Sequence, residues 1–327
     1  MINVPSNSEI ESLKPVLKKN LKIESRISLD SNPFATLETI KFQNLEKEYV
    51  LKSVVPILKT EVIVHEKINS YNINAAKILA SDMNNLKIQY FILMEKIKFT
   101  PIYQIPPDEA IDYYFDIADK LGHFHLKNVK NVKEFRNKGI KIFGPEKYLH
   151  IIDGIGKRIN KYSNNTKHEY LLTKELVEKF DYYIDTLRIM FKPFSKDSKF
   201  TLVHGDFDSG NLIINNENKN IFAIDWGLAH IDLPMIDMAH LLNATDLKID
   251  IRREIFEKYY LIAEKLYPND LSMQDVRNIG KVMHILYFID WFMYATENNF
   301  VDELYFLEQI HNRVQLLTDL LTDPHDE

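Results

Sequence analysis

The feature of this sequence that most constrains its fold is a change of hydrophobic pattern at about residue 98. Before that point the pattern is mainly that of β-strands: Ile40 and Phe42 alternate with polar residues, and a polar turn leads into a second alternating run. The segments with a clear pattern are 8–20 (helix), 39–43 and 49–55 (a hairpin), 61–70 (helix) and 86–94 (strand). The pattern predicts a small, β-rich, antiparallel lobe at residues 1–97.

After residue 98 the apolar residues recur at helical spacing, as they do from Ile111 to His125. Further helices are predicted at 145–161, 168–192, 251–265 and 273–318. A single β-hairpin, 211–214 and 221–226, interrupts them. Prolines at 101, 106 and 107 mark a hinge between the two parts. We therefore expect an α+β protein with two lobes, the second being a larger helical lobe at 98–327.

Composition excludes several classes of protein. Hydrophobic residues make up 45% of the chain, enough for a substantial core, while 27% are charged and no apolar run approaches the 18 residues of a membrane span. The chain contains 0 cysteines, which excludes disulfides and cysteine-ligated metals. The start of the chain has no apolar signal segment, and the net charge is −6. We expect a cytoplasmic protein that does not bind nucleic acid, with its oligomeric state left open.

The residues that carry chemistry lie around the interrupting hairpin. Asp206 and Asn211 are five positions apart on the approach to its first strand, and Asp225 ends its second strand. Phosphoryl transfer needs these residue types, since one carboxylate must orient a hydroxyl and accept its proton. An amide oxygen and a second carboxylate must hold Mg²⁺ against the phosphates of the nucleotide. The hairpin would bring the three residues together.

These motifs resemble the aminoglycoside phosphotransferase and choline kinase family, which is related to the protein kinases. Residues 204–206 read His-Gly-Asp, with Asn211 completing the catalytic loop, and residues 224–226 read Ile-Asp-Trp. Residues 234–239 match a further family motif, Pro-x-x-Asp-Leu-Ala. The resemblance implies a two-lobed, protein-kinase-like fold. It also implies that phosphate is transferred from ATP or GTP to a hydroxyl.

The resemblance assigns roles residue by residue. Asp206 would be the catalytic base, and Asn211 and Asp225 the Mg²⁺ ligands. His204 would orient the catalytic loop through hydrogen bonds, and Asp237 would brace it structurally. Asp206, Asn211, Asp225 and Lys52 are expected to converge in the cleft between the two lobes.

The upstream resemblance concerns the nucleotide. Lys52 fits the third-strand lysine that contacts the phosphates, and Glu61 would pair with it, with Glu66 one turn later as the alternative partner. Residues 91–96 resemble the hinge that binds the base, which makes Glu95 and Lys96 candidates for cofactor binding. The family's phosphate-covering loop differs here, because residues 1–121 contain no glycine and residues 31–36 would have to serve instead.

We therefore expect an Mg²⁺-dependent phosphotransferase acting on a small molecule. A nucleotide-binding pseudokinase is one alternative. A protein Ser/Thr kinase is another, although Gly205 in place of arginine and the lack of an Ala-Pro-Glu segment argue against it. Residues 290–327 contain nine acidic residues and only one arginine, Arg313. Asp290 and Glu297, near Trp291 and Tyr294, could attract a cationic acceptor such as an amino-alcohol, or could simply form a solvated face.

Overall fold

The structure is a computed structural model that describes most of the chain: residues 22–31, 35–43, 45–55, 60–68, 74–83, 90–163, 174–195, 199–297 and 303–322. The helix predicted at 8–20 lies outside the described residues. The chain divides into two compact units. The first comprises residues 1–124, 137–140 and 204–230, and the second comprises 125–136, 141–203 and 231–327. The hairpin that carries Asp206 and Asp225 thus belongs to the same unit as the N-terminal strands.

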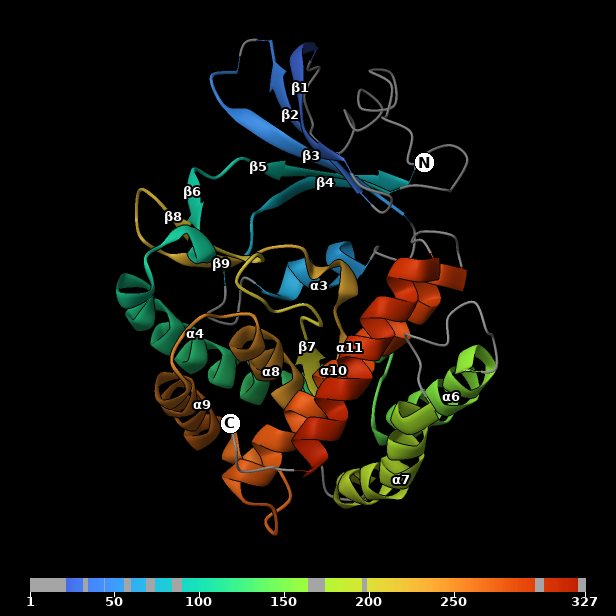
Figure 1. The fold of residues 1–327 in the computed structure, drawn as a ribbon. Helices are drawn as coiled ribbons and strands as arrows, with labels where there is room; N and C mark the ends of the chain where they lie inside the picture. The colour runs from blue at the N-terminus through green and yellow to red at the C-terminus, as the bar shows by residue number, and fades with distance from the viewer. Residues whose placement is uncertain are drawn as a thin grey trace. The chain divides into compact units, whose positions relative to one another are not determined.

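A five-stranded antiparallel sheet forms the N-terminal part of the first unit (Figure 1). Its strands run in the order β1-β2-β3-β5-β4. Their bounds are β1 (Ile23–Ser31), β2 (Ala35–Phe42), β3 (Glu48–Val54), β4 (Ile78–Met83) and β5 (Tyr90–Glu95). The helix α3 (Thr60–Ile68) lies between β3 and β4 in sequence. The predicted antiparallel lobe with one helix inside it is confirmed.

The two faces of this sheet carry different sets of side chains, because side chains alternate between the faces along each strand. One face carries a core cluster of Ile40, Phe42, Leu51, Phe91 and Leu93. The other carries Ala35, Val54, Ile92 and Met94, and on β3 it also carries Lys52, which lies opposite Leu37 of β2. A lysine therefore lies in an otherwise apolar surface, with 4% of its area exposed. Burying this charge requires partners.

A second, three-stranded sheet completes the first unit, with strand order β6-β8-β9. The strands are β6 (Phe99–Pro101), β8 (Leu212–Asn215) and β9 (Ile221–Ala223), and the 3₁₀ helix η5 (Trp226–Leu228) follows them. The predicted hairpin is thus present, although its second strand ends at Ala223, before Asp225. Asn74, just before β4, ties the hairpin to the N-terminal segment: its side chain donates to Ile221 O (3.0 Å), and its carbonyl accepts from Ala223 N (2.9 Å).

The second unit is mainly helical, as predicted. Its described elements are α5 (Val132–Asn137), α6 (Pro145–Ser163), α7 (Lys174–Phe191), β7 (Thr201–Val203), β10 (His230–Asp232), α8 (Met235–Asn243), α9 (Ile249–Ala263), α10 (Met273–Glu297) and α11 (Glu303–Thr322). The helix α4 (Pro107–Asn128) begins in the first unit and ends in the second. Helix α10 packs against α8, α6 and α11 and is buried along much of its length. No described helix is long and apolar enough to cross a membrane.

The continuous helix predicted at 273–318 is wrong. The structure has two helices there, with α10 ending at Glu297 and α11 beginning at Glu303, and the two pack against each other. Apolar residues recur at helical spacing in both helices, so the pattern alone predicted one helix over the whole range.

Candidate active site

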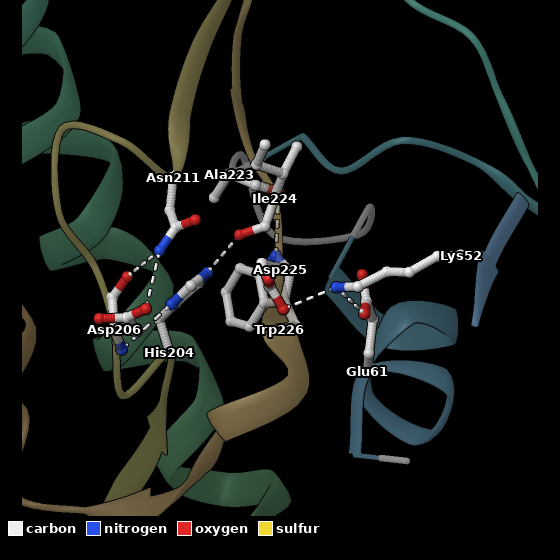
Figure 2. A network of polar contacts seen from close by, with 9 residues as sticks. All are labelled: Lys52, Glu61, His204, Asp206, Asn211, Ala223, Ile224, Asp225 and Trp226. Carbon is white, nitrogen blue, oxygen red and sulfur yellow. Dashed lines mark hydrogen bonds and ion pairs between the residues drawn. The ribbon is translucent and has the colours of Figure 1, made fainter. Parts of the chain in front are cut away.

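Lys52 bridges two carboxylates from distant parts of the first unit. Its Nζ lies 2.8 Å from Glu61 Oε2 on α3 and 2.7 Å from Asp225 Oδ1 (Figure 2). The side chains of Lys52 and Glu61 are 5% and 4% exposed, whereas that of Asp225 is 47% exposed. The structure therefore pairs Lys52 with Glu61, while the side chain of the alternative, Glu66, lies outside the described residues. One carboxylate of the trio is left accessible.

The charges of this trio are set by burial and by each other. Burial disfavours the cation of Lys52, but the negative charges of Glu61 and Asp225 outweigh this effect and raise the pKa of Lys52. Burial also opposes ionisation of Asp225, but the charge and hydrogen bond of Lys52 outweigh it and hold the pKa of that carboxyl below its usual range. For Glu61 burial wins, and its pKa is raised. Lys52 is thus a permanent cation beside an ionised Asp225.

Asp206 and Asn211 are joined within the loop that precedes β8. Asn211 Nδ2 donates to Asp206 Oδ2 (3.0 Å) and to Asp206 O (2.8 Å). The turn between them is closed by Asp208, whose Oδ1 accepts from the backbone N–H groups of Gly210 (2.8 Å) and Asn211 (3.0 Å). Sequence analysis missed Asp208. Its signal is an Asp-Ser-Gly turn, in which an aspartate caps the backbone two residues on.

His204 ties this loop to the strand end that carries Asp225. Its ring is fully buried, its Nε2 donates to Ile224 O (2.8 Å), and its Nδ1 accepts from Asp206 N (3.3 Å). The ring also packs against Trp226, with centroids 4.5 Å apart. A backbone bond from Ile224 N to Asn211 O (2.9 Å) adds a second tie. Figure 2 shows His204 between the Asp206–Asn211 pair and the Asp225 backbone, the place expected of a residue that orients the loop.

Gly205 permits this arrangement. It has φ +82°, and a Cβ at this position would lie 2.5 Å from the carbonyl oxygen of Leu228 and 2.9 Å from the ring of His230. Any other residue would need a positive φ and would collide with backbone, which cannot move aside as the end of a flexible side chain can. The arginine that protein kinases have in this motif is thus excluded here by the path of residues 228–230.

Asp225 also has an unusual backbone. Its φ of +60° and ψ of +58° place it in the left-handed region. A non-glycine residue held there costs on the order of 1 kcal/mol or more, and such residues gather at functional sites. The turn reverses the chain directly after β9 and directs the Asp225 carboxylate towards Lys52 (Figure 2).

Lys52, Glu61, Asn211 and Asp225 line a pocket of about 400 Å³ within the first unit, whereas Asp206 and His204 are not among the residues that line it. Its polar lining residues include Lys52, Glu61, His65, Asn211 and Asp225, while its apolar wall comprises Ala35, Leu37, Val50, Ala75, Ala76, Met94, Ile97, Phe99, Ile213 and Ala223. A charged end and a broad apolar wall suit a molecule with a flat apolar part and an anionic part. Residues 32–34 of the expected phosphate-covering segment lie outside the described residues.

Glu95 and Lys96 also line this pocket. Their side chains have protein partners: the Glu95 carboxylate accepts from Lys77 N (3.2 Å), and Lys96 Nζ donates to Glu48 (2.8 Å). A role in binding the nucleotide remains a prediction for both residues.

Asp237 lies in the second unit, on α8, and is fully buried. His125 Nε2 is 3.2 Å from its Oδ2, and His125 Nδ1 is 2.9 Å from the hydroxyl of Tyr259. His125 is thus a buried residue of a structural network. The proposed action of Asp237 on the catalytic loop remains a prediction.

The donor atoms at Asn211 and Asp225 fit Mg²⁺. The described residues hold no group of three or more histidine, aspartate or glutamate side chains placed for a metal. Mg²⁺ bound with a nucleotide needs fewer protein ligands, because phosphates and waters supply the remaining oxygens. An amide oxygen and an ionised, half-exposed carboxylate are hard oxygen donors of the right kind. Figure 2 shows the Asn211 amide oxygen turned away from Asp206.

Comparison with known proteins assigns this chain to a family. The sequence pattern described as "Phosphotransferase enzyme family" matches residues 39–268. A search among curated proteins finds no match. Solved structures do match over nearly the whole chain, and they share the protein-kinase-like fold that the motifs predict.

Three of these structures illustrate the different kinds of phosphotransferase to which the chain is similar. An aminoglycoside 2′-phosphotransferase-IIIa mutant in complex with GDP has 12% identity and a TM-score of 0.67, with 97% of this chain and 99% of that chain covered. Choline kinase LicA from Streptococcus pneumoniae has 14% identity and a TM-score of 0.59, covering 95% and 99%. Macrolide 2′-phosphotransferase MphH from Brachybacterium faecium has 10% identity and a TM-score of 0.60, covering 97% and 99%. At such identities the likeness establishes the fold.

Proposed function

The chain belongs to the phosphotransferase enzyme family, and from that premise we propose that it transfers the terminal phosphate of ATP or GTP to a hydroxyl group of a small molecule. The observation that carries the proposal is that two sets of polar contacts connect the proposed functional residues to one another. Lys52 joins Glu61 to Asp225, and His204 joins Asp225's strand to the loop of Asp206 and Asn211. A structural role alone would not require two oxygen donors and a buried cation at one pocket, with a candidate base hydrogen-bonded to one of the donors.

Asp206 is the proposed base. One of its carboxylate oxygens accepts from Asn211, which fixes the orientation of the carboxylate. The hydroxyl would donate its proton to this carboxylate as its oxygen attacks the terminal phosphorus, and the nucleoside diphosphate would leave. Because the main chain fixes both ends of the loop, Asp206 would need little rearrangement.

Asn211 and Asp225 are the proposed Mg²⁺ ligands, and Mg²⁺ when bound would neutralise charge on the phosphates. Asp225 forms an ion pair with Lys52. Lys52 would therefore hold the carboxylate in place and face the phosphates. Glu61 would fix Lys52 in turn. A preorganised cation of this kind stabilises the charge of the transition state without reorganising.

The acceptor is proposed to be an amino-alcohol. Similar structures hold kanamycin and hygromycin B, and one is a choline kinase. In the acidic segment, Asp290 pairs with Lys147 (2.8 Å) and Trp291 stacks against Tyr294 (5.7 Å). Both side chains of the ion pair are about one-third exposed, so the pair contributes on the order of 1 kcal/mol or less, and a cationic ligand could displace Lys147. The side chain of Glu297 lies outside the described residues.

The decisive experiment is turnover of labelled ATP and GTP against a panel of amino-alcohols, sugars and macrolides, with native protein and Asp206→Asn. We expect Asp206→Asn to lower kcat by about 10²–10⁴-fold and to leave nucleotide binding nearly unchanged, because the base acts only on the acceptor. Asp250→Asn, on the exposed side of α9, is the matched control. Nucleotide binding without turnover on any acceptor would favour the pseudokinase alternative. Full activity in Asp206→Asn would refute the assigned role.

A further inference from the structure

The strand β9, which leads to Asp225, has two sides that can form backbone hydrogen bonds. It is an edge strand of the sheet β6-β8-β9. On the side of β8, Ile224 N, just after the strand, donates to Asn211 O (2.9 Å). Because the direction of the backbone groups alternates along a strand, those of Ile221 and Ala223 point to the other side. An edge of this kind leaves backbone groups open unless another segment covers it.

Asn74 covers this other side of β9. It forms an isolated parallel bridge with Phe222. Its side-chain Nδ2 donates to Ile221 O (3.0 Å), and its backbone O accepts from Ala223 N (2.9 Å). The asparagine side chain thus supplies the donor that a backbone N–H supplies in a regular strand. Two bonds on either side of Phe222 fix the direction of β9, whereas a single bond would let the strand pivot.

The segment that carries Asn74 is itself held at its other end. Glu95 N, at the end of β5, donates to Lys77 O (3.0 Å), and Lys77 N donates to the Glu95 carboxylate (3.2 Å). Between the two ends, Ala75 and Ala76 line the pocket, and Ala75 is 4% exposed. Residues 74–77 therefore connect β5 to β9 along the pocket wall. Asn74 can act as an anchor for β9, because β5 holds its segment independently of the hairpin.

Asp225 lies two residues beyond Ala223 and has a left-handed backbone. A non-glycine residue keeps this conformation only where the contacts around it impose it. Before Asp225, the catalytic loop holds Ile224 and Asn74 holds Ala223. Weakening the second support would let the Asp225 carboxylate shift. Mg²⁺ requires near-ideal octahedral geometry, so a small shift of a ligand would weaken its binding.

We propose that Asn74 is a positioning residue for the metal site, which holds β9 so that the Asp225 carboxylate can bind Mg²⁺. The inference rests on the proposed function, in which Asp225 is a Mg²⁺ ligand. Asn74 is not among the described residues that line the pocket, and the two hydrogen bonds that connect it to β9 are made to backbone atoms. Its effect should therefore appear when the nucleotide binds with Mg²⁺ and be absent when it binds without metal.

The test measures binding of ATP and GTP by calorimetry, with Mg²⁺ and with EDTA, in the absence of acceptor. In Asn74→Ala the affinity with Mg²⁺ should fall about 3–10-fold, the range of one neutral hydrogen bond, while the affinity in EDTA stays the same. Asn74→Gln keeps the donor and should regain part of the loss. Without any ligand, the amides of residues 221–226 should exchange hydrogen faster in Asn74→Ala than in native protein.

Thr100→Val is the matched control. Thr100 Oγ1 donates to Asn216 Oδ1 (2.9 Å), so it binds the same hairpin through one side-chain hydrogen bond, from the side of β6. Its loss should leave nucleotide binding with Mg²⁺ unchanged. Asn74→Asp has the size of asparagine and lacks the donor, and it gives the same comparison if Asn74→Ala does not fold.

Unchanged binding with Mg²⁺ in Asn74→Ala would overturn the inference. An equal loss in Thr100→Val would also overturn it, since any weakening of the hairpin would then suffice. A loss in Asn74→Ala that is the same with Mg²⁺ and with EDTA would show that Asn74 only shapes the pocket wall, and the inference would be wrong. If native protein bound no nucleotide, the proposed function itself would fail, and this result is distinct from the other three.

Discussion

Two groups of buried ionisable side chains, one in each unit, differ in what they face. In the first unit Lys52 and Glu61 are almost fully buried, but they meet an Asp225 that is 47% exposed at the wall of a 400 Å³ pocket. In the second unit His125 and Asp237 are enclosed by packed helices, and the hydroxyls of Tyr259 and Tyr267, 3.0 Å apart, extend their network. The first group ends at solvent, and the second is closed on itself.

Access to solvent distinguishes the group proposed to act in catalysis from the group that supports the fold, whereas burial and charge do not. Both groups have the residue types of active sites, and both perturb pKa values: burial raises those of Tyr259 and Tyr267 in the closed network. Only the open group can exchange a protein partner for a ligand. We therefore expect changes in the open group to affect turnover and changes in the closed group to affect stability.

The largest expected effect is that of Asp225→Asn in the open group. It removes the accessible charge beside Lys52 and one proposed Mg²⁺ ligand, so turnover should fall on the order of 10²–10³-fold, with loss of Mg²⁺-dependent nucleotide binding. The free energy of unfolding should fall less than in the closed group, because the Asp225 carboxylate is half-exposed and Glu61 still pairs with the buried Lys52. Steady-state kinetics and urea unfolding measure the two quantities. Unchanged kinetics would break the distinction between the groups.

The same chemical change in the closed group, Asp237→Asn, should give the opposite result. The fully buried carboxylate would lose its charge next to His125, and the free energy of unfolding should fall by about 1–3 kcal/mol. Turnover per folded molecule should change much less than in Asp225→Asn. A variant with native stability and abolished turnover would show instead that Asp237 acts on the site directly.

A further closed group should make stability depend on pH. His284 on α10 is almost fully buried; burial, helped by the nearby charge of Arg313, lowers its pKa to about 3. The folded state then leaves His284 neutral below pH 6.5, where the unfolded chain binds a proton, so stability should fall as pH decreases from about 6.5 towards 3. Between pH 6.5 and 5 the loss should be about 2 kcal/mol. Urea unfolding across this range should show a shallower decline in His284→Gln but not in the exposed His150→Gln.

The smallest effect is expected for Glu61→Gln, because Glu61 is almost fully buried and would act on the phosphates only through Lys52. Gln can still accept a hydrogen bond from Lys52, so kcat should fall about tenfold, less than in Lys52→Ala. Glu66→Gln is the matched control on the same helix. A larger effect at Glu66 than at Glu61 would contradict the pairing that the structure shows.

Local sequence was sufficient for the elements and for the motif. Alternation at Ile40 and Phe42 predicted the hairpin of β2 and β3, and the spacing of Asp206, Asn211 and Asp225 predicted that a second hairpin would gather them. Both hairpins are formed by residues within about 20 positions of one another, so the local sequence pattern was enough to predict them. The helix break after Glu297 was missed because apolar periodicity continues on both sides of it.

Contacts between distant residues were decided only by the tertiary structure. The sequence proposed both Glu61 and Glu66 for Lys52, and the folded structure shows Glu61 as the partner. The second partner of Lys52, Asp225, lies 173 positions further along the chain. The need for glycine at 205 depends on a carbonyl 23 residues later, at Leu228. Residue type and spacing specify which chemistry a chain can perform. Which of those side chains meet is set by packing between segments that are distant in the sequence, and no local pattern records that packing.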